Sequence, residues 1–142
     1  MEVTAYIAKQ PVERRKLLTA IHQAIVRYDK SVTAVVKPVM GKEMIYYQAP
    51  GTFKYGLSSV KNYISLHAMP LYGSSLLHEK YKKLLPLASF QKGCINFESE
   101  KEMPPDIVKL LIGDCSKIDL AAMKKQWEES KKEKAKKKTS SR

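Results

Sequence analysis

Cysteine is scarce in this 142-residue chain, and no run of apolar residues is long enough to cross a membrane. Cys94 and Cys115 are the two cysteines, and neither belongs to a CxxC pair. We therefore expect two reduced, partly buried thiols, with a disulfide or a metal pair as the alternative. A membrane span needs about 18 consecutive apolar residues, and the start, MEVTAYIAKQ, lacks the apolar segment of a signal peptide. These absences predict a cytoplasmic protein that makes no contact with a membrane.

Acidic residues are also in short supply. The chain has 26 Lys and Arg against 14 Asp and Glu, a net charge of +12. Nine basic residues and three Glu lie from Lys124 onward, so this end carries +6, half of the excess. No apolar stripe follows Trp127, and a segment that cannot bury apolar surface does not fold by itself. We predict a single domain over residues 1–123, followed by the basic end of a helix and a disordered tail over residues 124–142.

What remains is the pattern of a globular α+β domain. Apolar residues recur at helical spacing in some segments and alternate at strand spacing in others. Helices are expected at 3–7, 11–29, 74–85, 104–113 and from 116 onward, and strands at 32–36, 43–48, 53–58, 63–69 and 94–97. Pro38 either stops the first strand or confines it to an edge, and Gly41-Lys42 suits a type II′ turn. We predict an antiparallel sheet of about five strands with helices packed on one face.

The polar face of this sheet is the first candidate site. Strict alternation places Phe53, Tyr55 and Leu57 under the helices. It leaves the opposite face to polar residues, namely Lys54, Ser58, Ser65, His67 and, depending on the strand register, Cys94 or Lys92. Such a row could hold an anion or a metal, since imidazole and thiolate are soft metal ligands. The alternative is that they are ordinary polar positions of an amphipathic sheet. A Cys94–His67 nucleophile pair would also need hydrogen-bonding distance and a third, orienting group.

The basic end is the second candidate site. Clustered lysines are typical of phosphate contact, and here they are Lys131, Lys132, Lys134, Lys136, Lys137 and Lys138. No aromatic residue follows Trp127 on which a base could stack. Glu and Lys at i, i+4 would equally support a solvated helix that binds nothing. The tyrosines at 46, 47, 55, 63, 72 and 81 cluster in the predicted sheet and the helix after it, either as core packing or as an aromatic ligand patch.

Three stretches of the chain resemble a known family. They are VTAYIAKQPVERRKLLTAIHQAI, KYGLSSVKNYISLHAMPLYG and KGCINFESEKEMPPDIVKLL, and together they are similar to the YdhG-like bacterial family of domains of unknown function over about residues 2–113. The resemblance implies a frataxin-like fold, and it implies an iron-chaperone role for some members. The basic end after Lys124 lies outside the shared region, and the acidic residues are scattered apart from the Glu98–Glu102 loop.

Together these observations favour a small, non-enzymatic binding or chaperone-like module without a cofactor. Its partner would be an unidentified small ligand, metal or protein on the exposed sheet face. Weak polyanion binding through the basic tail is the first alternative. A frataxin-like iron chaperone, with iron or another metal as cargo, is the second.

Overall fold

The computed structural model describes the backbone of residues 2–140 and their side chains, apart from those of residues 124, 127 and 133–140. The helices are α1 (Val3–Ala8), α2 (Val12–Tyr28), α3 (Met69–Gly73), α4 (Ser75–Leu84), α5 (Pro105–Ser116) and α6 (Leu120–Ser140). The strands are β1 (Thr33–Val39), β2 (Lys42–Ala49), β3 (Thr52–Ser59), β4 (Ile64–Ala68), β5 (Ser89–Gln91) and β6 (Cys94–Phe97). The fold is therefore the predicted α+β arrangement.

One antiparallel sheet of six strands organises the molecule. Its strand order is β1-β2-β3-β4-β6-β5, so the first four strands form a meander and the last two form a hairpin beside β4. The short edge strand β5 was not predicted, because its three residues contain one apolar position, Phe90, and are too few to show a repeating pattern. Pro38 lies within β1 at the other edge, where its missing N–H disrupts no ladder.

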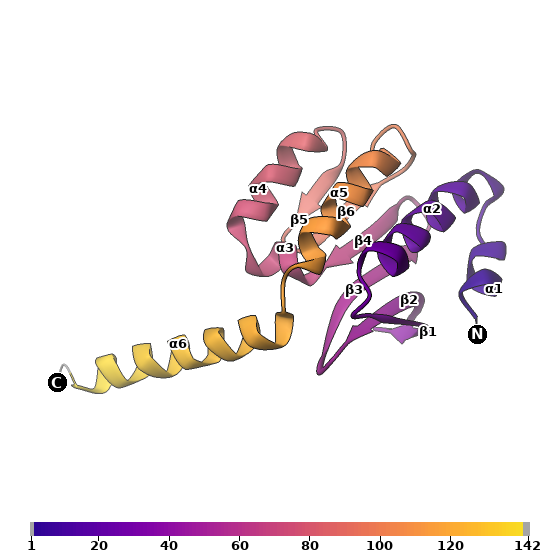
Figure 1. Cartoon of the computed structure of the whole chain (residues 1–142). Coiled ribbons are helices and arrows are strands. Elements are labelled where there is room, and N and C mark those ends of the chain that lie inside the picture. The colour runs from indigo at the N-terminus through magenta and orange to yellow at the C-terminus, as the bar shows by residue number, and fades with distance from the viewer. Residues whose placement is uncertain (1, 141–142) are drawn as a thin grey trace.

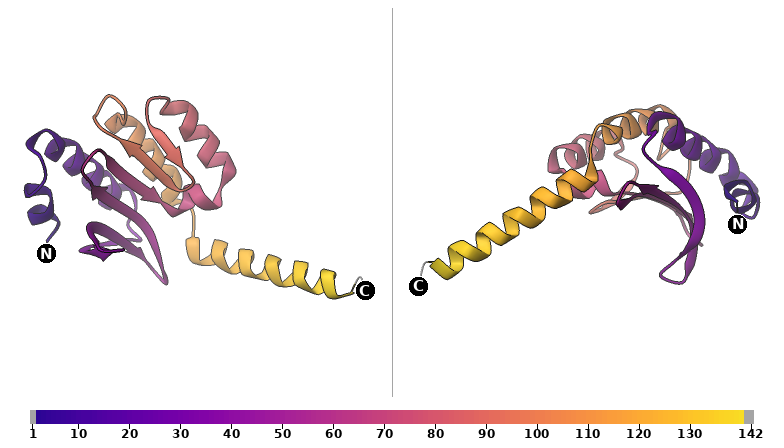
Figure 2. Two further views of the ribbon diagram at one scale, coloured as in Figure 1. Left: turned by 180° about the vertical axis from the view of Figure 1, so that it is seen from behind. Right: turned by 60° about the horizontal axis from the view of Figure 1, so that its bottom comes forward.

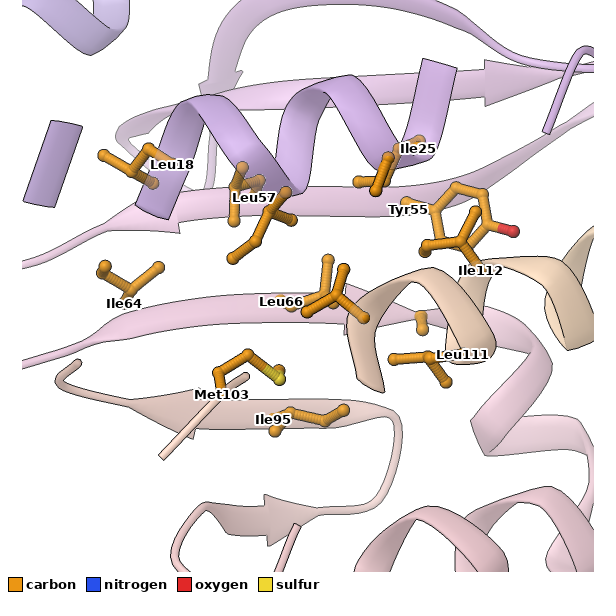
Figure 3. Close-up of a cluster of buried hydrophobic side chains, with 14 of the residues drawn as sticks. Leu18, Ile25, Tyr55, Leu57, Ile64, Leu66, Ile95, Met103, Leu111 and Ile112 are labelled. Atoms are coloured by element: carbon orange, nitrogen blue, oxygen red, sulfur yellow. The ribbon is translucent and has the colours of Figure 1, made fainter. Parts of the chain in front are cut away.

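Helices cover one face of this curved sheet. Figures 1 and 2 show α1, α2, α4 and α5 on the same side, with the opposite side free of helices except at one end. In Figure 3 the labelled side chains of α2 and α5 point toward those of the central strands. The core between the two layers includes Leu18, Ile25, Leu57, Leu66 and Ile112, all fully buried. We call the uncovered side the open face.

The helical stripe of α2 was predicted almost completely. Leu17, Leu18, Ile21, Ala24 and Ile25 are buried, whereas Tyr28, which was expected among them, is 40% exposed. The stripe of α5 was predicted in part, with Ile107, Leu110 and Leu111 expected on its buried side. Leu111 is buried and Ile107 packs against the core partly buried, but Leu110 is 55% exposed. The buried face also includes Val108, Ile112 and Cys115, which were not expected.

The β1–β2 turn differs from its predicted form. The β1–β2 hairpin turns at Met40-Gly41, where both residues have positive φ, 53° and 84°. Positive φ at both central positions belongs to a type I′ turn and not to the expected type II′ turn at Gly41-Lys42.

The start of α6 also differs from its predicted form. The pattern Ser116-x-x-Asp119 resembles a capping box and predicts a helix that begins near Ser116. In the structure Asp119 caps α6, since its carboxylate accepts the Ala122 N–H at 3.2 Å.

The last helix departs from the body of the molecule. In Figures 1 and 2 the yellow end of α6 projects away from the sheet. The helix continues to Ser140, through a segment where the sequence predicts a disordered tail. The expected boundary at residues 123/124 stays a prediction. No helix in the described range is apolar over the length that a membrane crossing demands.

Candidate functional site: the open face of the sheet and the pocket at its end

A bulge in β3 decides which side chains reach the open face. Tyr47 of β2 pairs with Tyr55, but the next residue, Gln48, pairs with Phe53. Lys54 is therefore an extra residue without a partner on β2. Two consecutive residues at a bulge can turn their side chains to the same side of a sheet. Here Lys54 joins Tyr55 beneath the helices, and Phe53 moves to the open face.

Lys54 lies in a buried polar cluster. Its side chain is 2% exposed, and Nζ lies 2.8 Å from Oδ2 of Asp29, the residue that ends α2. Nζ also donates to the carbonyl of Ile118, between α5 and α6, at 3.1 Å. The Tyr55 hydroxyl donates to the same carboxylate oxygen at 2.7 Å. Ser31 donates to the other oxygen through its N–H and its hydroxyl. The cluster joins α2, β3 and the α5–α6 connection.

The charge state of Asp29 follows from these contacts. Burial alone would raise the pKa of its carboxyl, but hydrogen bonds from Lys54, Ser31 and Tyr55 outweigh burial and lower the pKa overall. The carboxylate is ionised and fully engaged, which suits a structural ion pair. The prediction that Lys54 belongs to an open binding face is therefore wrong, because the bulge reverses the alternation on which it rested.

His67 and Cys94 do lie together on the open face. They are cross-strand partners on β4 and β6, and Nδ1 of His67 is 2.8 Å from Sγ of Cys94. Burial lowers the pKa of His67 and raises the pKa of Cys94. Both directions favour a neutral imidazole accepting from a neutral thiol. In the described part of the chain, no side chain is hydrogen-bonded to Nε2 of His67, the place where an orienting group would act.

Two other members of the predicted set lie apart from this pair. Ser65 is on the same face of β4, but it is 5% exposed. Lys92 lies in the β5–β6 turn with a φ of 52°. It lines a separate hollow of about 410 Å³ together with His78 and Glu79 of α4. These five predicted residues therefore form one pair, one covered hydroxyl and two lysines in different places.

A larger apolar pocket lies at the end of the open face, and the sequence analysis did not locate it. The pocket has a volume of about 510 Å³ and lies between the start of β3, α3 and the first turns of α6. Its apolar lining consists mainly of Phe53, Met69, Tyr72, Leu120 and Met123. We call it the apolar pocket. The predicted patch of tyrosines was its nearest signal in the sequence, but the patch omitted Phe53 and everything from α6.

Two glycines allow close packing around α3, which lines the apolar pocket. A Cβ at Gly73 would overlap the sulfur of Met123, so any side chain at this position would require the flexible Met123 side chain to shift. A Cβ at Gly93 would lie 3.1 Å from the Cβ of Tyr72, so the β5–β6 turn fits closely against α3. Both contacts hold α3 in place and leave Tyr72 53% exposed at the pocket mouth.

Aromatic rings continue from the pocket onto the open face. Phe53 stacks on Tyr46 of β2, with ring centroids 4.6 Å apart. The ammonium group of Lys37, on β1, lies 3.8 Å from the centroid of the Tyr46 ring. We call Tyr72, Phe53 and Tyr46 the aromatic track. Its existence depends on the bulge, which puts Phe53 on the same face as Tyr46.

The basic end meets this region only through α6. Lys131 and Lys132 are exposed on the helix. The side chains of the other predicted polyanion-binding residues, Lys134, Lys136, Lys137 and Lys138, lie outside the described residues, so that part of the prediction has no structural counterpart here.

Acidic groups that could hold a hard cation are dispersed. Asp29 is engaged by Lys54, and Asp114 accepts from Lys80 and Tyr81. Within the described residues, no three His, Cys, Asp or Glu side chains are placed to share one ion. The prediction of iron or another metal as cargo stays a prediction, without a donor set in this part of the chain. Both cysteines are free.

Comparisons with known proteins add no further assignment. A scan against protein-family models and searches of the curated proteins and of the solved structures each found no match. The functional argument therefore depends on the geometry of the open face and the apolar pocket.

Proposed function

We propose that this chain is a non-enzymatic binding module that takes a small aromatic or apolar ligand in the apolar pocket. The observation that carries the proposal is the pocket itself, about 510 Å³ between β3, α3 and α6. Ligand pockets usually measure about 300–1,000 Å³ and combine an apolar lining with a few polar groups. Thr52, Gln126 and Ser130 supply those polar groups at the rim.

The chemistry of the open face favours binding over catalysis. A cysteine nucleophile acts as its thiolate and needs a lowered pKa. Burial raises the pKa of Cys94 instead, and His67 beside it is also favoured in its neutral form. The pair would therefore act as a weakly polar part of the open face, not as an acyl-transfer centre.

An anionic aromatic dye tests the proposal directly. We expect 1-anilinonaphthalene-8-sulfonate to bind the folded protein at one saturable site with enhanced fluorescence. Ser130→Trp should fill the mouth of the pocket and weaken dye binding by at least about tenfold, the equivalent of ~1.4 kcal/mol. Ala121→Trp, on the same helix but outside the lining, is the matched control and should bind as the wild type does. If the dye does not bind, or if both variants bind it equally, the pocket proposal is wrong.

Polyanion binding through the basic end is a second candidate. It is supported by the net charge of +6 after residue 123 and by the projection of α6 away from the body (Figure 1). Deleting residues 131–142 should then remove binding to heparin or to nucleic acid together with its salt dependence. Unchanged binding by the truncated chain would refute this candidate.

The YdhG-like relationship is also kept as a proposal. It is supported by the layout of the molecule, in which helices cover one face of an antiparallel sheet (Figure 2). This layout is the one that the resemblance implies. The iron-chaperone role would require its own test, such as uptake of ferrous iron by the purified chain at neutral pH.

A further inference from the structure

We infer that the ligand of the apolar pocket is a base of single-stranded nucleic acid, whose backbone continues across the open face toward the lysines of the β1–β2 hairpin. This inference rests on the proposed function, because it assigns a ligand class to the same pocket. It joins the pocket and the positive charge, which the sequence analysis treated as unrelated features.

The two aromatic rings that line the pocket offer a stacking surface, and they are Phe53 and Tyr72. Tyr46 lies between Phe53, with ring centroids 4.6 Å apart, and the ammonium group of Lys37, so it supports Phe53 from behind and has no free ring face of its own. Unpaired bases stack on aromatic side chains, and such stacking needs no particular base because every base has a π face. Tyr72 is 53% exposed, so one ring face is available at the pocket mouth. In a duplex the bases are already stacked on one another, so the pocket selects single strands.

Positive charge lies at one end of the aromatic track. The ammonium of Lys37 is 3.8 Å from the centroid of the Tyr46 ring. Lys42, exposed on the same face of the neighbouring strand β2, lies close to it along the β1–β2 hairpin. The exposed Lys125 and Lys132 of α6 do not add to this charge, because helical spacing puts them on the opposite side of α6 from the residues that line the pocket. Lysines contact phosphates without reading sequence, so a strand could keep its backbone on Lys37 and Lys42 and place a base in the pocket.

The apolar lining also argues against charge alone as the basis of binding. A polyanion that binds only through lysines would need no pocket, and its preferred surface would be the solvated end of α6. The pocket is instead lined by residues of β3, α3 and α6, where the basic helix meets the body of the molecule. A ligand that carries both a flat apolar group and a phosphate uses the two features together, and a nucleotide in a single strand has both.

The test measures fluorescence anisotropy of a fluorescein-labelled 12-nucleotide oligodeoxythymidylate at low and moderate salt, with a 12-base-pair duplex for comparison. We expect tighter binding of the single strand. Tyr72→Ala should weaken it by roughly 5- to 150-fold, the range for loss of one base-stacking contact. The control Tyr63→Ala removes a ring of comparable exposure, 39%, from the β3–β4 turn and should change nothing.

A second pair of variants separates stacking from charge. Lys37→Gln should reduce the slope of log affinity against log salt by about 0.7, the value for one phosphate contact on a single strand. Lys30→Gln, an exposed lysine after α2 on the helical side, is the matched control and should leave the slope unchanged. Tyr72→Ala should lower affinity without altering this slope.

The outcomes distinguish this inference from the proposed function. If 1-anilinonaphthalene-8-sulfonate binds but the oligonucleotide does not, the pocket stands and nucleic acid is the wrong ligand. If single strand, duplex and polyglutamate bind equally and Tyr72→Ala has no effect, binding is by charge alone and the inference is overturned. If neither dye nor oligonucleotide binds, the proposed function fails as well.

Discussion

Replacing Lys54 by methionine tests the placement on which the site description depends. The side chain of Lys54 is 2% exposed and its Nζ lies 2.8 Å from Oδ2 of Asp29, which is also buried. Methionine keeps most of the volume but removes the charge, so Asp29 would stay buried without a cation. Breaking a buried ion pair from one side costs about 3–5 kcal/mol. A domain of this size is stable by about 5–15 kcal/mol in total, so the loss should be large.

Equilibrium unfolding in urea, followed by circular dichroism, measures this loss. With an m value of about 2 kcal/mol/M, the expected loss moves the urea midpoint down by about 1.5–2.5 M. The double variant Asp29→Asn with Lys54→Met removes both charges, and Asn can still accept from Tyr55 and Ser31. We expect it to be more stable than Lys54→Met alone, because no charge is left buried and unpaired.

The pH dependence supplies an independent check. In the wild type the pKa of Asp29 is lowered, so its contribution to stability is present above the unfolded pKa of about 3.9 and is lost as pH falls through the folded pKa. In Lys54→Met, burial should raise the pKa of Asp29 above its unfolded value. The penalty should then be full at pH 7 and shrink as pH falls through this raised pKa. A cost below about 1 kcal/mol at pH 7, as for an exposed lysine, would refute the buried position of Lys54.

Two further predictions concern the thiols and the β3–β4 turn. Burial raises the pKa of Cys94, and that of Cys115 to about 12, so at pH 7 iodoacetamide should label Cys94 more slowly than free glutathione and Cys115 only after unfolding, as read by mass spectrometry of the digested protein. Labelling of Cys94 faster than glutathione would instead indicate a nucleophile activated by His67. Arg14 of α2 donates to backbone carbonyls of the β3–β4 turn, so Arg14→Ala should cost about 1–3 kcal/mol in urea unfolding and speed amide exchange there. Arg15→Ala, which loses one exposed contact within its own segment, should cost less than about 0.5 kcal/mol, and equal losses for the two variants would contradict the assignment.

The elements that sequence reasoning found are those with a strong local signal. The buried stripe of α2 and the alternation of β4 repeat over enough residues to identify both the element and its covered side. Ser74 or Ser75 was expected to cap the helix after β4, and the hydroxyl of Ser74 accepts the Leu77 N–H. These features depend on neighbours in the chain, so they can be read without knowing what packs on them.

The features that were missed depend on distant partners. Edge strand β5 has three residues and is defined by its pairing with β6. The apolar pocket joins β3, α3 and α6, whose lining residues run from Thr52 to Ser130 in the chain, and no local pattern links them. The His67–Cys94 contact was considered as a pair, but its distance depends on the register of β4 with β6.

The error at Lys54 and the discovery of the pocket have one cause. Without the bulge, alternation along β3 would place Phe53 beneath the helices and Lys54 on the open face. The extra residue exchanges them, because the Tyr47–Tyr55 pair is followed directly by Gln48–Phe53. Lysine can enter the core only because Asp29 ends α2 at 2.8 Å from its ammonium group. The same shift lets Phe53 stack on Tyr46 and line the pocket. The buried ion pair thus stabilises the irregular strand that presents the aromatic surface, and the stability of the core and the shape of the binding surface are coupled through one residue.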